Sequence, residues 1–174
     1  KNDFTHKHLS DQFAAHSIDR VYLAICWNVL SPPNGKIKTL LTRSNKNRTK
    51  MMSSVSKGKR AVTHYKTLEI LKSKKNVNLA TILECRLETG RTHQIRVHLS
   101  EKGNSLIGDK TYGRSPQGKL KLLSDNAMLA VKNLPGQALH AQSLGFIHPK
   151  KEKIVHFQSV MPDYLSNLIN SIKS

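Results

Sequence analysis

Residues 87–99 read LETGRTHQIRVHL, and this stretch is the most informative part of the sequence for the fold. An alternating apolar pattern ends at its first residue, and Gly90 then permits a sharp turn. Thr92 can cap a helix in which Ile95 and Leu99 lie four residues apart on one side. The stretch therefore predicts a strand, a tight turn and a helix with one buried side.

Two arginines in this stretch could bind anions. The free backbone N–H groups at the start of the predicted helix, with Arg91 beside them, form a natural anion site. Arg96 lies one turn further on, where a rigidly held guanidinium could support a buried carboxylate through a bidentate pair. The residues alone favour equally a surface helix with two ordinary arginines.

The rest of the chain is rich in strands. Amphipathic helices are expected over residues 2–17 and 163–173, and the helix after Gly90 should stop at Gly103. The predicted strands cover residues 20–30, 61–70, 79–87, 139–146 and 154–157, with a turn at 31–35 and polar connections at 72–78 and 114–137, the last around a short helix. The fold class is therefore α+β with a largely antiparallel sheet, in one domain over residues 1–174.

The strand at residues 20–30 alternates strictly and presents two faces. Val21 and Leu23 belong to a face that is apolar throughout, whereas Tyr22 lies on the opposite face. The two faces should therefore differ in role, although a half-buried strand tyrosine is common.

Basic residues dominate the chain. Lys and Arg total 29 against 11 Asp and Glu, which gives a formal net charge of +18. Residues 20–68 contain no acidic side chain, and residues 42–59 form a predicted long, exposed basic loop. A field of this sign favours a polyanion, with nucleic acid as the leading candidate. The alternative is a solvated basic surface that serves solubility.

Several other classes of protein are disfavoured. Cys26 and Cys85 lie far apart, which argues against a zinc site or a disulfide framework and fits a reducing, cytoplasmic compartment. No apolar run approaches membrane-spanning length. The histidines lack metal-ligand spacing, and there is neither a phosphate-binding P-loop nor a hydrolase nucleophile elbow, so no metal or nucleotide cofactor is expected.

Residues 89–99, followed by the Gly-Asp-Lys-Thr-Tyr-Gly run at 108–113, resemble the C-terminal signature of the RluA/RluD-type RNA pseudouridine synthases. The resemblance extends over nearly the whole chain. Residues 20–24, 48–51 with 59–65, and 139–141 with 148–149 resemble the family's tyrosine segment, its middle segment and its closing segment. The middle segment is most similar to that of the enzymes acting on large-subunit ribosomal RNA.

This resemblance implies a cofactor-free isomerisation of uridine to pseudouridine in RNA. The family uses an aspartate as nucleophile, a tyrosine that stacks on the target base and an arginine that pairs with the aspartate. Carried over by position, Tyr22 is the stacking residue and Arg96 is the partner of the aspartate. Stacking suits a base taken out of a helix for chemistry. The residues expected to contact RNA are Arg43, Arg48, Lys59, Arg60 and Arg91.

The sequence departs from the family at the nucleophile. The family's aspartate sits in a His-Arg-Leu-Asp-type motif upstream of the tyrosine, and the 174 residues contain no such motif. Asp3, Asp11 and Asp19 precede Tyr22 but lack the right neighbours. We therefore expect an incomplete catalytic domain that is inactive alone and could self-associate through an exposed sheet edge. The alternative is a non-catalytic RNA-binding protein on the same scaffold.

Overall fold

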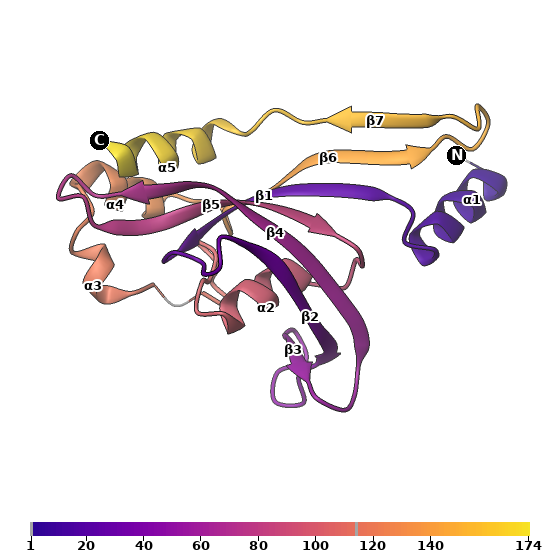
Figure 1. Ribbon diagram of the computed structural model, residues 1–174, viewed down its shortest axis with the longest axis horizontal. Coiled ribbons are helices and arrows are strands. Elements are labelled where there is room, and N and C mark those ends of the chain that lie inside the picture. Colours follow the sequence, from indigo (N-terminus) through magenta and orange to yellow (C-terminus); the bar gives the residue numbers. More distant parts are fainter. Residues whose placement is uncertain (1, 114) are drawn as a thin grey trace.

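A computed structural model describes residues 2–113 and 115–174, and the first position of the predicted connection at 114–137 lies outside them. In the described residues seven strands form one antiparallel sheet in the order β3-β2-β4-β5-β1-β6-β7 (Figure 1). The strands are β1 (Asp19–Trp27), β2 (Asn34–Arg43), β3 (Met51–Ser54), β4 (Lys59–Lys72), β5 (Asn78–Leu87), β6 (Leu139–Ile147) and β7 (Ile154–Gln158). The helices are α1 (Asp3–Ala14), α2 (Gln94–Glu101), α3 (Gln117–Leu120), α4 (Asp125–Lys132) and α5 (Asp163–Lys173). The predicted α+β class with an antiparallel sheet is confirmed.

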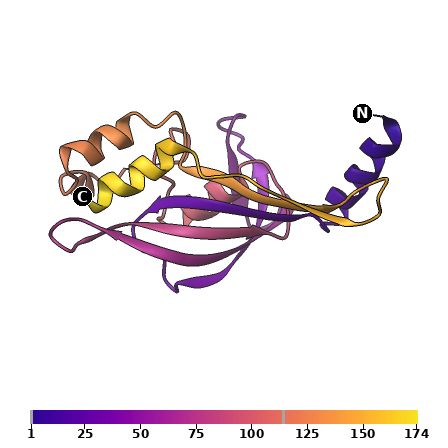
Figure 2. The ribbon, with the colours of Figure 1, turned by 90° about the horizontal axis from the view of Figure 1, so that it is seen from above.

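The alternation in β1 builds a core on each side of the sheet. Leu23, Ile25 and Trp27 pack in one cluster with the buried residues of α4 and α5. Ala24 and Cys26 face the other way and share a cluster with the buried side of α2. Figure 2 shows α4 and α5 lying together against the sheet. The predicted two-faced strand is therefore confirmed, and Tyr22 lies on the α2 side.

In the basic region the sequence analysis missed one strand, and its prediction of a long loop is wrong. Residues 34–43 form β2, which the sequence did not indicate, and it pairs with both β3 and β4. The segment 42–59 is not one long loop, because it holds the end of β2, all of β3 and the start of β4. Backbone pairing between strands overrides the weak apolar pattern of this region.

The cap predicted for α2 is also wrong. His93, not Thr92, precedes the first helical residue, and it adopts a left-handed conformation with φ of 55° and no side-chain cap. The buried side of the helix is as predicted, because Ile95 and Leu99 are both buried.

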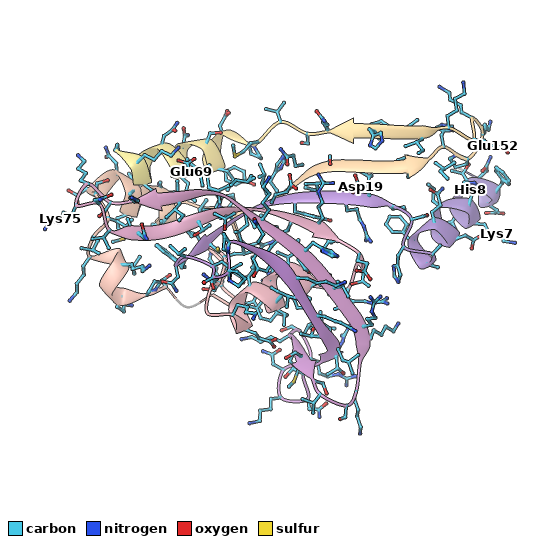
Figure 3. All side chains as sticks on the ribbon, viewed as in Figure 1. Lys7, His8, Asp19, Glu69, Lys75 and Glu152 are labelled. Atoms are coloured by element: carbon cyan, nitrogen blue, oxygen red, sulfur yellow. The ribbon has the colours of Figure 1, made fainter. Side chains whose placement is uncertain are left out.

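The two ends of the elongated sheet carry different elements. α1 lies beside the turn of the β6–β7 hairpin at one end, and α4 and α5 lie at the other (Figure 1). The Lys173 Nζ atom of α5 lies 2.7 Å from Glu69 Oε1 of β4, and Figure 3 labels Glu69 beside that helix. Among residues 2–113 and 115–174, no helix is both long and apolar enough to cross a membrane.

Candidate functional site

Tyr22 lies on β1 where the pairing with β6 changes register. Val21 pairs with Ser143 and Tyr22 with Ala141, so Gln142 is the extra residue of a bulge. Bulges re-aim side chains and are common near active sites. The Tyr22 side chain lines a pocket of about 330 Å³ between β1, β6, β7 and α1. An aromatic ring on the wall of a pocket is a suitable surface for stacking a base.

Arg20 lines the same pocket and lies on the same face of β1 as Tyr22. Its guanidinium packs against Gly90, where a methyl group would come within 2.0 Å of Arg20 Nη1. Burial lowers the pKa of Arg20, as does the charge of Arg91, while the Tyr22 hydroxyl acts in the opposite direction. Because Gly90 has no side chain, the turn after β5 can lie directly against Arg20, which lines the pocket of Tyr22.

A second pocket, of about 500 Å³, lies on the other side of this turn. Gly90 lines it together with the basic residues Arg43, Lys59 and Arg91. Three of the five residues predicted to contact RNA are thus brought to one surface depression, and it shares Gly90 with the surroundings of Tyr22. Clustered cations in a concave surface raise the local concentration of a polyanion.

The other two predicted RNA contacts lie in different surroundings. Arg60 is exposed and forms an ion pair with Glu88, which also contacts Lys36 and His64. Its backbone carbonyl accepts a hydrogen bond from Arg91 Nε at 3.0 Å, so it borders the basic pocket. Arg48 is exposed in the turn before β3 and does not line that pocket.

A buried glutamine holds the turn between β5 and α2. Gln94 Oε1 accepts hydrogen bonds from the Arg91 backbone N–H at 3.0 Å and the Thr89 hydroxyl at 2.8 Å. Its Nε2 donates to the Val62 carbonyl at 2.9 Å and to the Thr63 hydroxyl oxygen at 3.0 Å. The Gln94 side chain thus satisfies one backbone N–H before the helix, that of Arg91, which a bound anion could otherwise have taken. Arg91 remains there as the positive group.

Arg96 has a carboxylate partner within the chain. Its Nε and Nη2 atoms each donate to Asp109 at 2.8 Å, and the side chains of the two residues are 12% and 1% exposed. Of the two interpretations that the residues left open for Arg96, the structure shows the one with a bidentate carboxylate partner. The aspartate is not an upstream nucleophile but the one in the Gly-Asp turn. The Arg96 guanidinium also lies 4.9 Å from the centre of the Tyr112 ring.

Tyr112 connects this ion pair to the basic region. Its hydroxyl accepts a hydrogen bond from the Met51 backbone N–H at 2.7 Å and lies 2.9 Å from His93 Nδ1. Burial, and secondarily the charge of Arg96, lower the pKa of His93. The ion pair is therefore built into the packing of α2 against β3.

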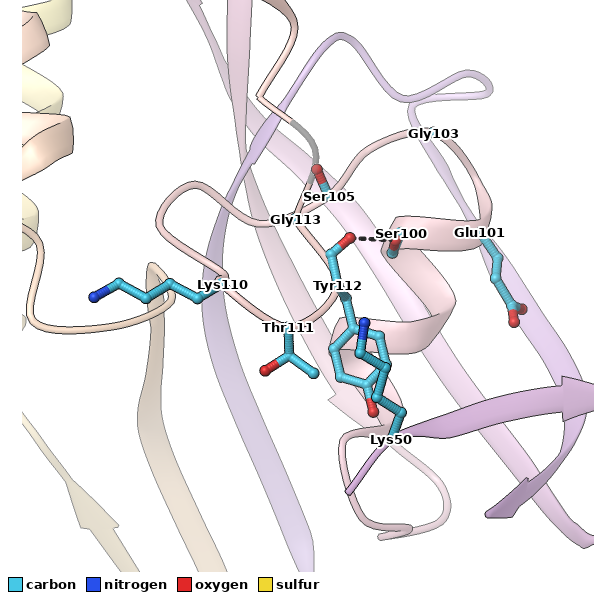
Figure 4. A pocket seen from close by; sticks show the side chains of 9 residues that line it. All are labelled: Lys50, Ser100, Glu101, Gly103, Ser105, Lys110, Thr111, Tyr112 and Gly113. Atoms are coloured by element: carbon cyan, nitrogen blue, oxygen red, sulfur yellow. Dashed lines mark hydrogen bonds between the residues drawn. The ribbon is translucent and has the colours of Figure 1, made fainter. Parts of the chain in front are cut away.

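A further pocket, of about 680 Å³, lies apart from the residues predicted for the site. Figure 4 shows its lining by Lys50, Lys110 and Tyr112 near the end of α2, with Ser100 Oγ donating to the Tyr112 carbonyl. None of the seven predicted site residues lines it. Across the described ranges, no three His, Cys, Asp or Glu side chains are grouped as metal ligands.

Sequence reasoning missed Arg20 and Gln94. Arg20 was given no role of its own within the tyrosine segment at 20–24, although its position two residues before Tyr22 puts it on the same face of a strand. That alternation was a usable signal. Gln94 carried no signal, because its four partners come from two separate segments of the chain.

Comparison with known proteins gives consistent matches. A family described as RNA pseudouridylate synthase matches residues 1–101. A "Ribosomal large subunit pseudouridine synthase D" from Zymomonas mobilis is 46% identical over 99% of the chain and 50% of its own length. A chloroplastic "RNA pseudouridine synthase 2" from Arabidopsis thaliana is 32% identical over 99% of the chain and 42% of its own length.

A solved structure supports the fold. "Human RNA Pseudouridylate Synthase Domain Containing 4" is similar with a TM-score of 0.71 and 20% identity, covering 99% of the chain and 69% of its own. The chain spans about half the length of the curated relatives it matches.

Proposed function

Because the chain belongs to the RNA pseudouridylate synthase family, we propose that it forms the RNA-binding half of an active site that isomerises uridine to pseudouridine. The observation that carries this is the arrangement around Gly90. This residue contacts Arg20 behind the Tyr22 pocket and also lines the pocket of Arg43, Lys59 and Arg91. A stacking surface thus lies next to a cationic surface, as an extruded nucleotide and its backbone require.

The substrate in this proposal is large-subunit ribosomal RNA. The Zymomonas mobilis relative is named as a synthase of the large ribosomal subunit, which supports this choice. The resemblance of the middle segment of the sequence to enzymes acting on that RNA supports it as well. The working compartment is the cytoplasm, no nucleotide cofactor takes part, and copies of the chain can associate through an exposed sheet edge. The two edge strands are β3 and β7, and most of β7 is exposed.

Tyr22 stacks on the target base in this proposal, and Arg96 acts as a positioning residue. The Nε and Nη2 donors of Arg96 are both hydrogen-bonded to Asp109, so the guanidinium holds the turn after α2 in place. These two donors are then not free to form a bidentate pair with a second carboxylate. The nucleophilic aspartate comes from residues beyond the 174 of this chain. A covalent mechanism needs that group.

The test is a tritium-release assay on RNA labelled at uridine C5, together with RNA binding across a salt series. The chain alone is expected to bind RNA with affinity that falls steeply as salt rises, and to release no tritium. Replacing Arg43, Lys59 or Arg91 by Gln should each reduce the logarithmic salt slope by about 0.7 on single-stranded RNA. Salt-independent binding would contradict an RNA role. Tritium release by the chain alone would contradict the proposal that the nucleophilic aspartate lies outside these 174 residues.

The absence of a His-Arg-Leu-Asp motif from these 174 residues also favours a second candidate, a non-catalytic RNA-binding protein. The coding sequence immediately upstream distinguishes the two. An in-frame His-Arg-Leu-Asp segment supports the enzyme, and a contiguous upstream sequence without one supports the binding protein.

A further inference from the structure

The guanidinium of Arg20 is buried without a counter-charge. The residue is 8% exposed, and its Nε and Nη2 atoms have no hydrogen-bond partner among the described residues. An arginine keeps its charge inside a protein, so burial without a partner costs free energy. Such a group in a folded chain points to a partner that completes it.

Nearby carboxylates in the described part of the chain are engaged elsewhere. Asp19 and Glu84 contact Arg86, at 3.6 Å and 3.0 Å. Glu88 contacts Arg60, Lys36 and His64 on the surface of the neighbouring strands. Of the two titratable groups that act on Arg20, Tyr22 favours its charge and Arg91 disfavours it. The carboxylates nearby in the described residues are therefore engaged elsewhere and do not pair with Arg20.

The position of Arg20 is nevertheless well defined. One side of the guanidinium lies against Gly90, and its Cζ atom lies 5.6 Å from the centre of the Phe13 ring. Phe13 belongs to α1, in which only Gln12 is buried, and its ring is 48% exposed. The Phe13 side chain can move while the Gln12 side chain keeps its two hydrogen bonds to the Ile147 backbone, and such a movement uncovers the edge of the guanidinium.

We propose that Arg20 binds an oxyanion, namely a phosphodiester group of the RNA next to the nucleotide whose base stacks on Tyr22. This rests on the proposed function. Arg20 and Tyr22 line one pocket, so a base and its own backbone can engage both. The planar fork of an arginine matches the geometry of phosphate.

The neighbouring charges favour phosphate over a protein carboxylate. Beyond Gly90, the pocket of Arg43, Lys59 and Arg91 continues the positive surface that begins at Arg20. A single carboxylate would neutralise Arg20 alone, whereas a polyanion can follow the whole row of cations.

The test compares Arg20→Met with Arg86→Met, which removes the same charge from an exposed position on β5. In the free chain, Arg20→Met should raise Tm by about 4 °C, because a well-packed apolar side chain replaces an unpaired buried charge. Inorganic phosphate should raise the Tm of the wild-type chain more than that of Arg20→Met. RNA affinity should fall about tenfold for Arg20→Met and about twofold for Arg86→Met.

Gly90→Ala provides a variant with unchanged net charge. Its Cβ would displace Nη1 of Arg20, so the phosphate-dependent gain in Tm should again be lost. A loss of stability in Arg20→Met that Arg20→Lys restores would overturn the proposal in favour of a structural role. A lost phosphate response with RNA affinity equal to that of Arg86→Met would overturn RNA as the source and indicate a carboxylate. A wild-type chain that binds no RNA, yet shows the Arg20-dependent phosphate response, would refute the proposed function and the RNA source but leave the oxyanion site.

Discussion

Arg96 and Asp109 form a bidentate ion pair between α2 and the turn that follows it, with both nitrogen–oxygen distances at 2.8 Å. Burial alone would raise the pKa of the Asp109 carboxyl. The hydrogen bonds from Arg96 and from the backbone N–H groups of Tyr112 and Thr111 outweigh this and lower the pKa. The pair therefore stabilises the fold fully above about pH 4, and the contribution is lost as pH falls through the lowered folded-state pKa.

Asp109→Asn is expected to destabilise the chain by about 3 kcal/mol in urea unfolding at pH 7. The substitution leaves the largely buried Arg96 charge without a counter-charge, which is more costly than the loss of an exposed pair. Glu84→Gln is the control, since it breaks the exposed contact with Arg86 and should change stability by less than about 1 kcal/mol. Equal losses of stability in the two variants would show that the buried Arg96–Asp109 pair stabilises the fold no more than the exposed pair does.

The buried imidazole of His98 should make stability depend on pH. Burial lowers its pKa to about 4, and its ring nitrogens lie 2.9 Å from the Thr39 and Thr63 hydroxyls. The unfolded chain binds this proton near pH 6.5, so stability is complete above that pH and falls as pH drops toward 4. The loss over this window should be about 3 kcal/mol.

His98→Gln should remove most of this pH dependence when the free energy of unfolding is measured by urea at several pH values between 4 and 7. His6→Gln, at an exposed position in α1, should leave the pH dependence unchanged. Parallel profiles for the wild type and His98→Gln would exclude His98 as the source.

The fold class was predictable from local patterns, but β2 was not. Its pairing partners are β3 and β4, while its fully buried residues, Ile37 and Leu41, are four apart and separated by cationic or half-buried positions. Strict alternation is the signal for a strand, and here the outer face breaks it. Pairing with neighbours on both sides decides the conformation.

The candidate site was only partly predictable for a similar reason. The motif and the face of β1 located Tyr22, and the spacing in α2 suggested that Arg96 holds a carboxylate. That Asp109 is the partner of Arg96 depends on a turn that brings the chain back to α2 thirteen residues after Arg96, and no local pattern in the sequence encodes this. That two Arg20 nitrogens have no hydrogen-bond partner among residues 2–113 and 115–174 depends on how α1 and the Gly90 turn pack.

Glu88 should lower the affinity for RNA, because its carboxylate pairs with the cationic side chains of Arg60 and Lys36. Hydrogen bonds from Arg60 and His64 lower its pKa to about 2, so the carboxylate is ionised throughout the pH range of binding measurements. Glu88→Gln is expected to raise RNA affinity about threefold at low salt, and the gain should disappear at high salt. The control is Glu69→Gln, which makes the same charge change beside α5, far along β4. An equal gain in both variants would reduce the effect to net charge alone.

Gln94 should link the stability of the chain to RNA binding, because its side chain bonds the Arg91 backbone as well as β4. Gln94→Leu removes the acceptor of the Arg91 N–H and of the Thr89 hydroxyl, and a loss of about 3 kcal/mol is expected in urea unfolding. Gln94→Glu keeps the acceptor for Arg91 and removes the donor to Val62, so it should lose less stability and retain more RNA affinity than Gln94→Leu. The control is Gln117→Leu, at an exposed position of α3, which should change neither quantity. If Gln94→Leu bound RNA like the wild type under conditions where it is fully folded, the turn would not be what positions Arg91 for RNA.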